Sequence, residues 1–157
     1  MTESSSNNKD DNEIDIKIPP NSVEAEQSIL GGLMLDNSAW DKIADIIVKS
    51  DFYRKDHQII FDGISSLIES AEACDVVTLS EYLDNKGNLD SVGGLEYLAT
   101  LANETAGSAN VVSYAKILRE RSVLRSLIAA GNEISGSAFS TEGRSASELV
   151  DQAERLV

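Results

Sequence analysis

The chain has 157 residues, a length that suits one domain with its own hydrophobic core and leaves little room for a second large domain. Its formal net charge of −14 makes most of the surface repel the phosphate backbone of nucleic acids. The one cysteine, Cys74, cannot form an internal disulfide, and no apolar run approaches the about 20 residues of a membrane span. We therefore expect a cytoplasmic protein that is neither secreted nor embedded in a membrane.

The chain begins with residues rich in Ser, Asn, Asp and Glu that offer almost nothing to bury, so residues 1–17 are predicted to form a disordered tail. Two prolines end this tail, and Asn21 or Ser22 is positioned to cap a helix that runs to about Leu35. Glu26 falls toward the apolar face of that helix but lies near its start. There we expect its carboxylate to reach water.

Four further short helices are predicted next, so that residues 18–108 form a compact globule of about five helices. The second helix opens at Ser38, and the third follows the segment DFYRKDHQIIF at 51–61. A capping box at Thr78 starts the fourth, and the fifth comes after two adjacent glycines.

The segment from about Asn110 to Ala138 contains no proline and stays apolar at helical spacing. As a helix it would be about 40 Å long, which exceeds the width of so small a globule. A break near Gly143 and a capping box at Ser145 then start a last helix, so residues 109–157 are predicted to form a long antiparallel helical hairpin. The fold class is therefore all-α, and the last helix has no terminating signal, which suggests a chain truncated before further domains.

The predicted hairpin carries more apolar surface than one partner helix can cover. Monomeric soluble proteins rarely leave such patches open, so we expect self-association through the hairpin. The alternative is a hairpin that folds back on the globule. The residues expected at self-association contacts are Ile117, Leu124, Leu127, Ile128, Ile134 and Leu149.

The segment AKILRERSVLR at 115–125 holds four of the 13 Lys and Arg residues of the chain: Lys116, Arg119, Arg121 and Arg125. In one interpretation they form the rim of a packed apolar stripe and pair with acidic groups of the same surface. In a second, they contact an acidic protein or an identical subunit. A third is binding of single-stranded nucleic acid, but the further basic and aromatic residues typical of such a site do not follow.

The sequence predicts no catalytic residues, no metal ligands and no cofactor site in this fragment. None of its glycine-containing segments fits a phosphate-binding loop. His57 and Cys74 are the only residues of their types, so a metal site or a Cys/His pair would need both to meet carboxylates from elsewhere. His57 is better interpreted as an ordinary residue at a helix start.

Long blocks of the sequence resemble the N-terminal domain of the bacterial replicative DNA helicase, the DnaB family. The blocks run nearly end to end, in the family's order, although residues 104–110 lack a proline that the family pattern has there. They are PPNSVEAEQSILGGLMLDNSAW (19–40), DFYRKDHQIIF (51–61), TLSEYLDNKGNLDSVGGLEYLATLAN (78–103) and SANVVSYAKILRERSVLR (108–125).

The resemblance implies a parent protein in which a linker and a RecA-like ATPase domain follow the hairpin. That missing domain would bind ATP and Mg, make most of the DNA contacts and unwind duplex DNA at the replication fork of a bacterial cell. The N-terminal domains would form a collar of dimers, a trimer of dimers in the hexamer, and would dock the helicase-binding domain of primase. A helicase loader is a further candidate partner, and Leu95 and Tyr97 are candidate contacts to a second subunit or to primase.

Overall fold

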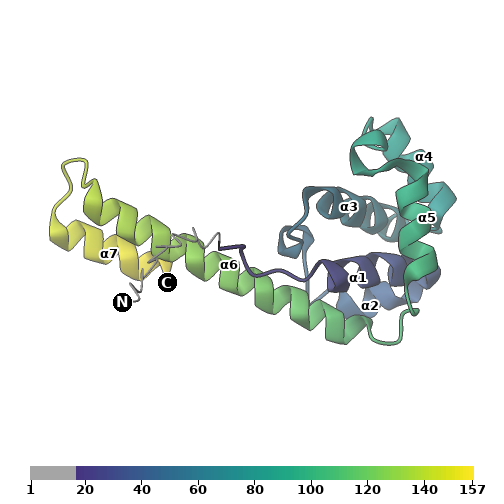
Figure 1. Ribbon diagram of the computed structural model, residues 1–157, viewed down its shortest axis with the longest axis horizontal. Coiled ribbons are helices and arrows are strands. Elements are labelled where there is room, and N and C mark those ends of the chain that lie inside the picture. Colours follow the sequence, from purple (N-terminus) through teal and green to yellow (C-terminus); the bar gives the residue numbers. More distant parts are fainter. Residues whose placement is uncertain (1–16) are drawn as a thin grey trace, which may run out of the picture.

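The computed structural model describes residues 17–157, so the predicted tail lies outside the described residues except for Lys17. Within the described part, all regular elements are helical, and they form a globule from which a two-helix hairpin projects (Figure 1). The prediction of an all-α globule of about five short helices followed by a long hairpin is confirmed. The elements are α1 (Val23–Leu35), η1 (Asn37–Ala39), α2 (Trp40–Ile43), η2 (Lys49–Asp51), α3 (Lys55–Glu69), α4 (Val76–Asn85), η3 (Asp90–Val92), α5 (Gly94–Glu104), α6 (Val111–Phe139) and α7 (Ala146–Leu156), where η marks a short 3-10 helix.

Aspartates cap two of the helical segments that the sequence analysis assigned to neighbouring hydroxyl residues. The predicted start at Ser38 is wrong, because the Asp36 carboxylate caps η1 by accepting the Ser38 backbone N–H at 3.1 Å. The predicted start at Thr78 is also wrong. Asp75 caps α4, and the Thr78 hydroxyl accepts the Asp75 N–H at 2.9 Å. An ionised carboxylate is the stronger acceptor at a helix N-terminus, where the helix dipole favours negative charge.

Helix α1 is the centre of the globule and packs against α3, α5 and α6. Its approach to α5 depends on Gly31, where an added Cβ atom would lie 2.1 Å from the Leu101 carbonyl oxygen. The close contact of α1 and α5 therefore requires glycine at this position. The largest fully buried apolar side chains of the core are Ile29, Leu30, Leu33, Ile43, Phe52, Ile60, Ile64, Leu79, Leu83, Leu98 and Leu118.

Helix α6 belongs to both parts of the molecule. Its first third is built into the globule, where Val111, Ala115 and Leu118 are buried, and the helix has no fully buried residue after Ser122. The distal part extends away from the globule and pairs with α7 in an antiparallel hairpin (Figure 1). The alternative of a hairpin that folds back on the globule is therefore wrong. The predicted capping box at Ser145 is present at the start of α7.

Candidate interaction surfaces

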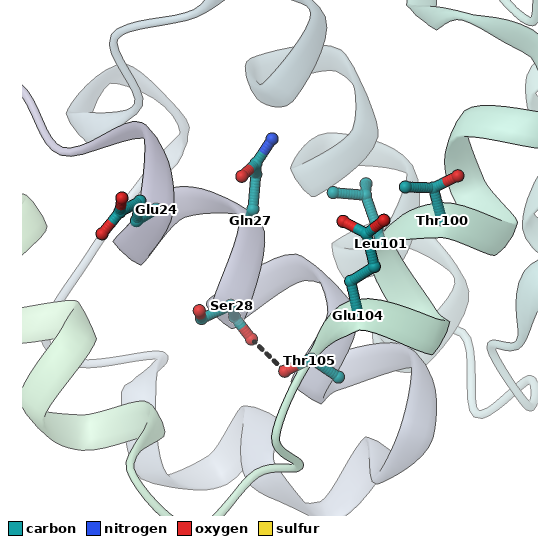
Figure 2. A pocket seen from close by; sticks show the side chains of 7 residues that line it. All are labelled: Glu24, Gln27, Ser28, Thr100, Leu101, Glu104 and Thr105. Carbon is teal, nitrogen blue, oxygen red and sulfur yellow. Dashed lines mark hydrogen bonds between the residues drawn. The ribbon is translucent and has the colours of Figure 1, made fainter.

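A polar groove lies between α1 and α5, with a volume of about 190 Å³ (Figure 2). Its walls are held together across the groove floor by the Thr105 hydroxyl, which donates to the Ser28 carbonyl oxygen at 3.4 Å. Glu24 of α1 and Glu104 of α5 both line the groove, and no Lys or Arg does. We call this feature the α1–α5 groove; its lining residues are Glu24, Gln27, Ser28, Thr100, Leu101, Glu104 and Thr105.

A buried polar network lies next to this groove and joins three helices. His57 of α3 is fully buried; its Nδ1 is 2.8 Å from Glu26 Oε1 on α1, and its Nε2 is 2.6 Å from the Tyr97 hydroxyl on α5. The Glu26 carboxylate also accepts the backbone N–H groups of Tyr53 at 3.0 Å and Arg54 at 3.3 Å. The expectation that Glu26 reaches water is wrong, because the residue is 1% exposed and satisfies the donors that precede α3.

The donors and acceptors of this network follow from the chemistry of Glu26. An ionised carboxylate only accepts hydrogen bonds, so His57 donates to it through Nδ1. His57 Nε2 lies within hydrogen-bond distance of the Tyr97 hydroxyl, whose oxygen also accepts the Gln27 amide N–H at 3.4 Å. Because Gln27 also lines the α1–α5 groove, the network ends at the groove wall. His57 is thus more than the ordinary helix-start residue that the sequence suggested.

An ion pair at the start of α3 borders the same network. Arg54 Nε donates to Asp56 Oδ1 at 3.0 Å, and the Arg54 guanidinium lies over the Tyr97 ring, 5.6 Å from its centroid. Burial raises the pKa of Asp56, but the hydrogen bond from Arg54 and nearby positive charge outweigh it and hold the pKa below its usual range. The hydrogen bond to Asp56 raises the pKa of Arg54. These contacts fix the position of Tyr97 on the globule surface.

The other candidate contact on α5, Leu95, is half exposed and makes no hydrogen-bonded link to the network. Tyr97, in contrast, is only partly exposed, and its hydroxyl is engaged with His57. Leu95 therefore offers an exposed apolar side chain, whereas Tyr97 offers an aromatic ring whose position is fixed by its contacts. Whether either contacts a second subunit or primase stays a prediction.

The distal hairpin exposes an apolar surface on both of its helices. Leu127 is 60% exposed, Ile128 48% and Leu124 38%, and all three were expected at self-association contacts. A hollow of about 200 Å³ opens where the end of α7 meets α6, and Leu127 is part of its wall. We call this the hairpin surface; its exposed apolar residues are Val123, Leu124, Leu127, Ile128, Val150 and Leu156.

The remaining three residues expected at self-association contacts are less accessible in this chain. Ile117 is half-buried and packs against the core of the globule. Ile134 and Leu149 are half-buried within the hairpin. Sequence analysis did not single out Val123 or Val150, although both lie on an apolar stripe at helical spacing, and that periodicity could have found them.

The basic segment divides into two pairs of side chains. Arg119 donates to the Asp51 carboxylate at 2.9 Å, and Arg125 donates to backbone carbonyl oxygens of Pro20 and Asp51, each at 2.8 Å. Lys116 is exposed and Arg121 is half-buried, and neither forms an ion pair with the described residues. Two of the four cations are thus committed to the protein itself, which does not favour the nucleic-acid alternative.

Residues 17–157 contain no cluster of His, Cys, Asp and Glu that could hold a metal ion. The same range contains no helix long and apolar enough to cross a membrane. Cys74 is buried, and burial raises the pKa of its thiol to about 12, which keeps the sulfur protonated and unreactive.

An all-α domain that combines a small globule with a projecting hairpin and two exposed surfaces has a counterpart among known families. Residues 18–120 match the family described as the DnaB-like helicase N terminal domain. Since the match covers most of the chain, the protein belongs to this family.

Individual relatives agree with this assignment. The chain is 42% identical over 142 residues to the replicative DNA helicase DnaB of Haemophilus influenzae, covering 90% of this chain and 30% of the relative. It is 36% identical over 141 residues to the replicative DNA helicase DnaC of Bacillus subtilis, covering 90% and 31%. The chain thus spans about 30% of the length of these curated relatives.

Solved structures show the same fold. The N-terminal domain of DnaB helicase from Mycobacterium tuberculosis superimposes with a TM-score of 0.85 at 36% identity, covering 88% of this chain and 97% of that domain. A DnaB-like replicative helicase, reported with its interactions with primase, superimposes with a TM-score of 0.63 at 20% identity, covering 81% of this chain and 30% of that one. The second likeness concerns the fold alone.

Proposed function

We propose that this chain is the collar domain of a replicative DNA helicase, which joins subunits through its hairpin and docks primase on its globule. The observation that carries the proposal is the hairpin surface, which lies on a projection that the globule does not cover (Figure 1). Burying apolar area is the main driving force of association, and a second copy offers a matching apolar surface. In the collar, dimers formed in this way assemble into a trimer of dimers.

Primase docking is the second part of the proposed function. The DnaB-like helicase that shares this fold interacts with primase, which supports a docking role for the common domain. On this chain, the α1–α5 groove and the adjoining ring of Tyr97 offer a shaped polar face away from the hairpin surface. Docking there would raise the effective concentration of primase at the fork without any chemistry in this domain.

The parent protein, in this proposal, unwinds duplex DNA with ATP and Mg bound to a further domain. The chain is similar to replicative helicases but spans only about 30% of their length, which supports placing ATP-driven unwinding in a further domain. In this proposal the collar itself does not turn over ATP.

Sedimentation analysis of the purified chain across a range of concentrations tests self-association. We expect wild type to form dimers or larger assemblies, and Leu127→Asp to sediment as a monomer because it places a charge in the apolar contact. Val77→Asp is the matched control, since Val77 is 62% exposed on α4, outside the hairpin. A wild type that stays monomeric, or a Leu127→Asp variant that associates normally, would contradict this part of the proposal.

Calorimetric titration with the helicase-binding domain of the primase from the same organism tests docking. Reversing charge in the groove with Glu24→Lys and Glu104→Lys should weaken binding by at least about tenfold, or about 1.4 kcal/mol. Glu81→Lys with Asp84→Lys, on exposed positions of α4, makes the same change in net charge and should bind as wild type. Equal affinity in both double variants would remove the groove as the docking site.

A further inference from the structure

Two arginines of α6, Arg119 and Arg125, both contact Asp51 of the short helix η2. Arg119 Nη1 lies 2.9 Å from Asp51 Oδ1, and the other oxygen of this carboxylate accepts the Val48 N–H at 2.8 Å. Arg125, about 1.7 helical turns further along, donates through Nη2 to the Asp51 carbonyl oxygen at 2.8 Å. The Asp51 carboxylate is 1% exposed, so its negative charge depends on these partners.

Arg125 joins three separate parts of the chain at one point. Besides the Asp51 carbonyl, its guanidinium donates through Nη1 to the Pro20 carbonyl oxygen at 2.8 Å, and it lies over the Tyr53 ring, 5.5 Å from the centroid. The planar guanidinium supplies several donors in fixed directions, which allows one side chain to bridge two carbonyl groups and stack on an aromatic ring. We call Arg119 and Arg125, with their contacts, the arginine clamp.

The arginine clamp lies where α6 leaves the globule. Beyond Arg125, no hydrogen bond or ion pair within residues 17–157 joins α6 to the globule. From Arg125 to Phe139 the helix continues for about 21 Å, so a tilt of about 10° at the clamp would move the hairpin tip by roughly 4 Å. A small change in these contacts is therefore amplified at the hairpin surface.

We propose that Arg119 and Arg125 are positioning residues that fix the direction of the hairpin, so that the hairpin surface is presented to a second copy in one orientation. This inference rests on the proposed self-association. Neither arginine has to touch the partner: holding the hairpin in its bound direction reduces the conformational entropy that association must otherwise remove. The clamp explains why the basic segment lies at this point of α6 and why arginines rather than lysines occupy both positions.

Distance measurement by pulsed electron paramagnetic resonance tests the clamp directly. Spin labels are placed on cysteines at exposed positions of the hairpin and the globule, Phe139→Cys and Val77→Cys, in a chain whose buried thiol is removed by Cys74→Ala. At a concentration where the chain is monomeric, we expect one narrow distance distribution. Arg119→Ala combined with Arg125→Ala should broaden it and, in the unlabelled protein, weaken self-association about tenfold.

The matched control removes the same charge from the same helix. Lys116→Ala combined with Arg121→Ala takes away the two cations that have no ion-pair partner among the described residues, and it should change neither the distance distribution nor self-association. Arg125→Lys restores the charge but not the two-carbonyl bridge, so its distribution should be intermediate in width. A distribution as narrow as wild type in the Arg119/Arg125 double variant would overturn the proposal.

Two further outcomes separate the clamp from the proposed function. If the distribution broadens while wild type never self-associates, the clamp stands as a device that fixes the hairpin and its role in association is refuted. If the double alanine variant fails to fold, Arg125→Lys and Asp51→Asn decide the question, because Asp51→Asn keeps the backbone carbonyl and removes the charge that Arg119 pairs with. Unchanged distributions in both of these folded variants would refute the clamp.

Discussion

Removal of the buried Glu26 carboxylate of α1 should strongly destabilise the globule. The residue is 1% exposed and accepts hydrogen bonds from the Tyr53 N–H, the Arg54 N–H and His57 Nδ1. Glu26→Ala leaves these three donors without their acceptor inside the protein. It also breaks the link between α1 and the segment that leads into α3.

The magnitude follows from the number of donors left without a partner. Each buried donor that loses its acceptor costs about 1–3 kcal/mol, and water entering the vacated space recovers part of that cost. We therefore expect a loss of roughly 3–5 kcal/mol in the free energy of unfolding. At about 2–4 °C per kcal/mol for a domain of this size, Tm should fall by roughly 10 °C. Glu26→Gln retains the volume and one accepting oxygen, so its loss should be smaller.

Urea denaturation followed by circular dichroism, together with calorimetry for Tm, measures this effect. The control is Glu24→Ala, two residues earlier on the same helix, where the side chain is exposed and changes should stay within about 0.5 kcal/mol. If Glu26→Ala were no more destabilising than Glu24→Ala, the three hydrogen bonds would contribute nothing, and the interpretation of this network as a structural joint would be wrong.

Three further predictions concern the glycines, two capping or paired aspartates, and the cysteine. Gly31→Ala should lower the free energy of unfolding by about 3 kcal/mol or more, because the added methyl group overpacks the contact with α5 and shifts the backbone. Gly131→Ala should raise it by up to about 1 kcal/mol, because an added Cβ there meets nothing within 4 Å. Chemical denaturation of both variants checks these values. The hydrogen bond from the Thr78 N–H lowers the pKa of Asp75. Burial raises the pKa of Asp56, but the hydrogen bond from Arg54 and nearby positive charge together outweigh burial and lower it. The ionised carboxylates therefore contribute stability that is complete above the unfolded pKa of about 4 and is lost as pH falls through the folded pKa values. Replacing both by Asn should reduce the difference in stability between neutral and acidic pH, measured by denaturation at each pH. Because burial raises the pKa of Cys74 to about 12, iodoacetamide should modify it at neutral pH only after unfolding, as mass spectrometry with and without urea would show.

The elements that local sequence determines could be predicted well. The absence of proline between Asn110 and Ala138 and the apolar periodicity there indicated one long helix, and α6 runs from Val111 to Phe139. The Ser145 capping box marked the start of α7 because its two hydrogen bonds involve residues only three apart. Such patterns depend on interactions between residues close in sequence, so they can be predicted without knowing how the helices pack.

The buried network could not be predicted in the same way. His57 lies 31 residues from Glu26 and 40 from Tyr97, so their hydrogen bonds exist only after three helices have packed. The available signal was a single glutamate on the apolar face of α1, four residues before Leu30, together with the only histidine in the chain. A polar side chain on an apolar helix face requires a hydrogen-bond partner when it is buried, and this requirement could have suggested that Glu26 and His57 meet.

The arginines illustrate a different limit. Charge composition identified Lys116, Arg119, Arg121 and Arg125 as one basic segment, yet only two of the four reach Asp51 or Pro20. Which two do so depends on the rotation of α6 against the globule, and sequence spacing alone does not determine that rotation.

Helix α7 contains no buried residue, and α6 contains none beyond Ser122. Local opening of the distal hairpin therefore exposes little new apolar surface and should require far less free energy than unfolding of the globule. Proteases act on locally opened segments, and a copy without a partner would be cleaved there first. Assembly would close that route by covering the same side chains. Under the proposed self-association, the lifetime of each copy in the cell would then depend on whether it has found a partner.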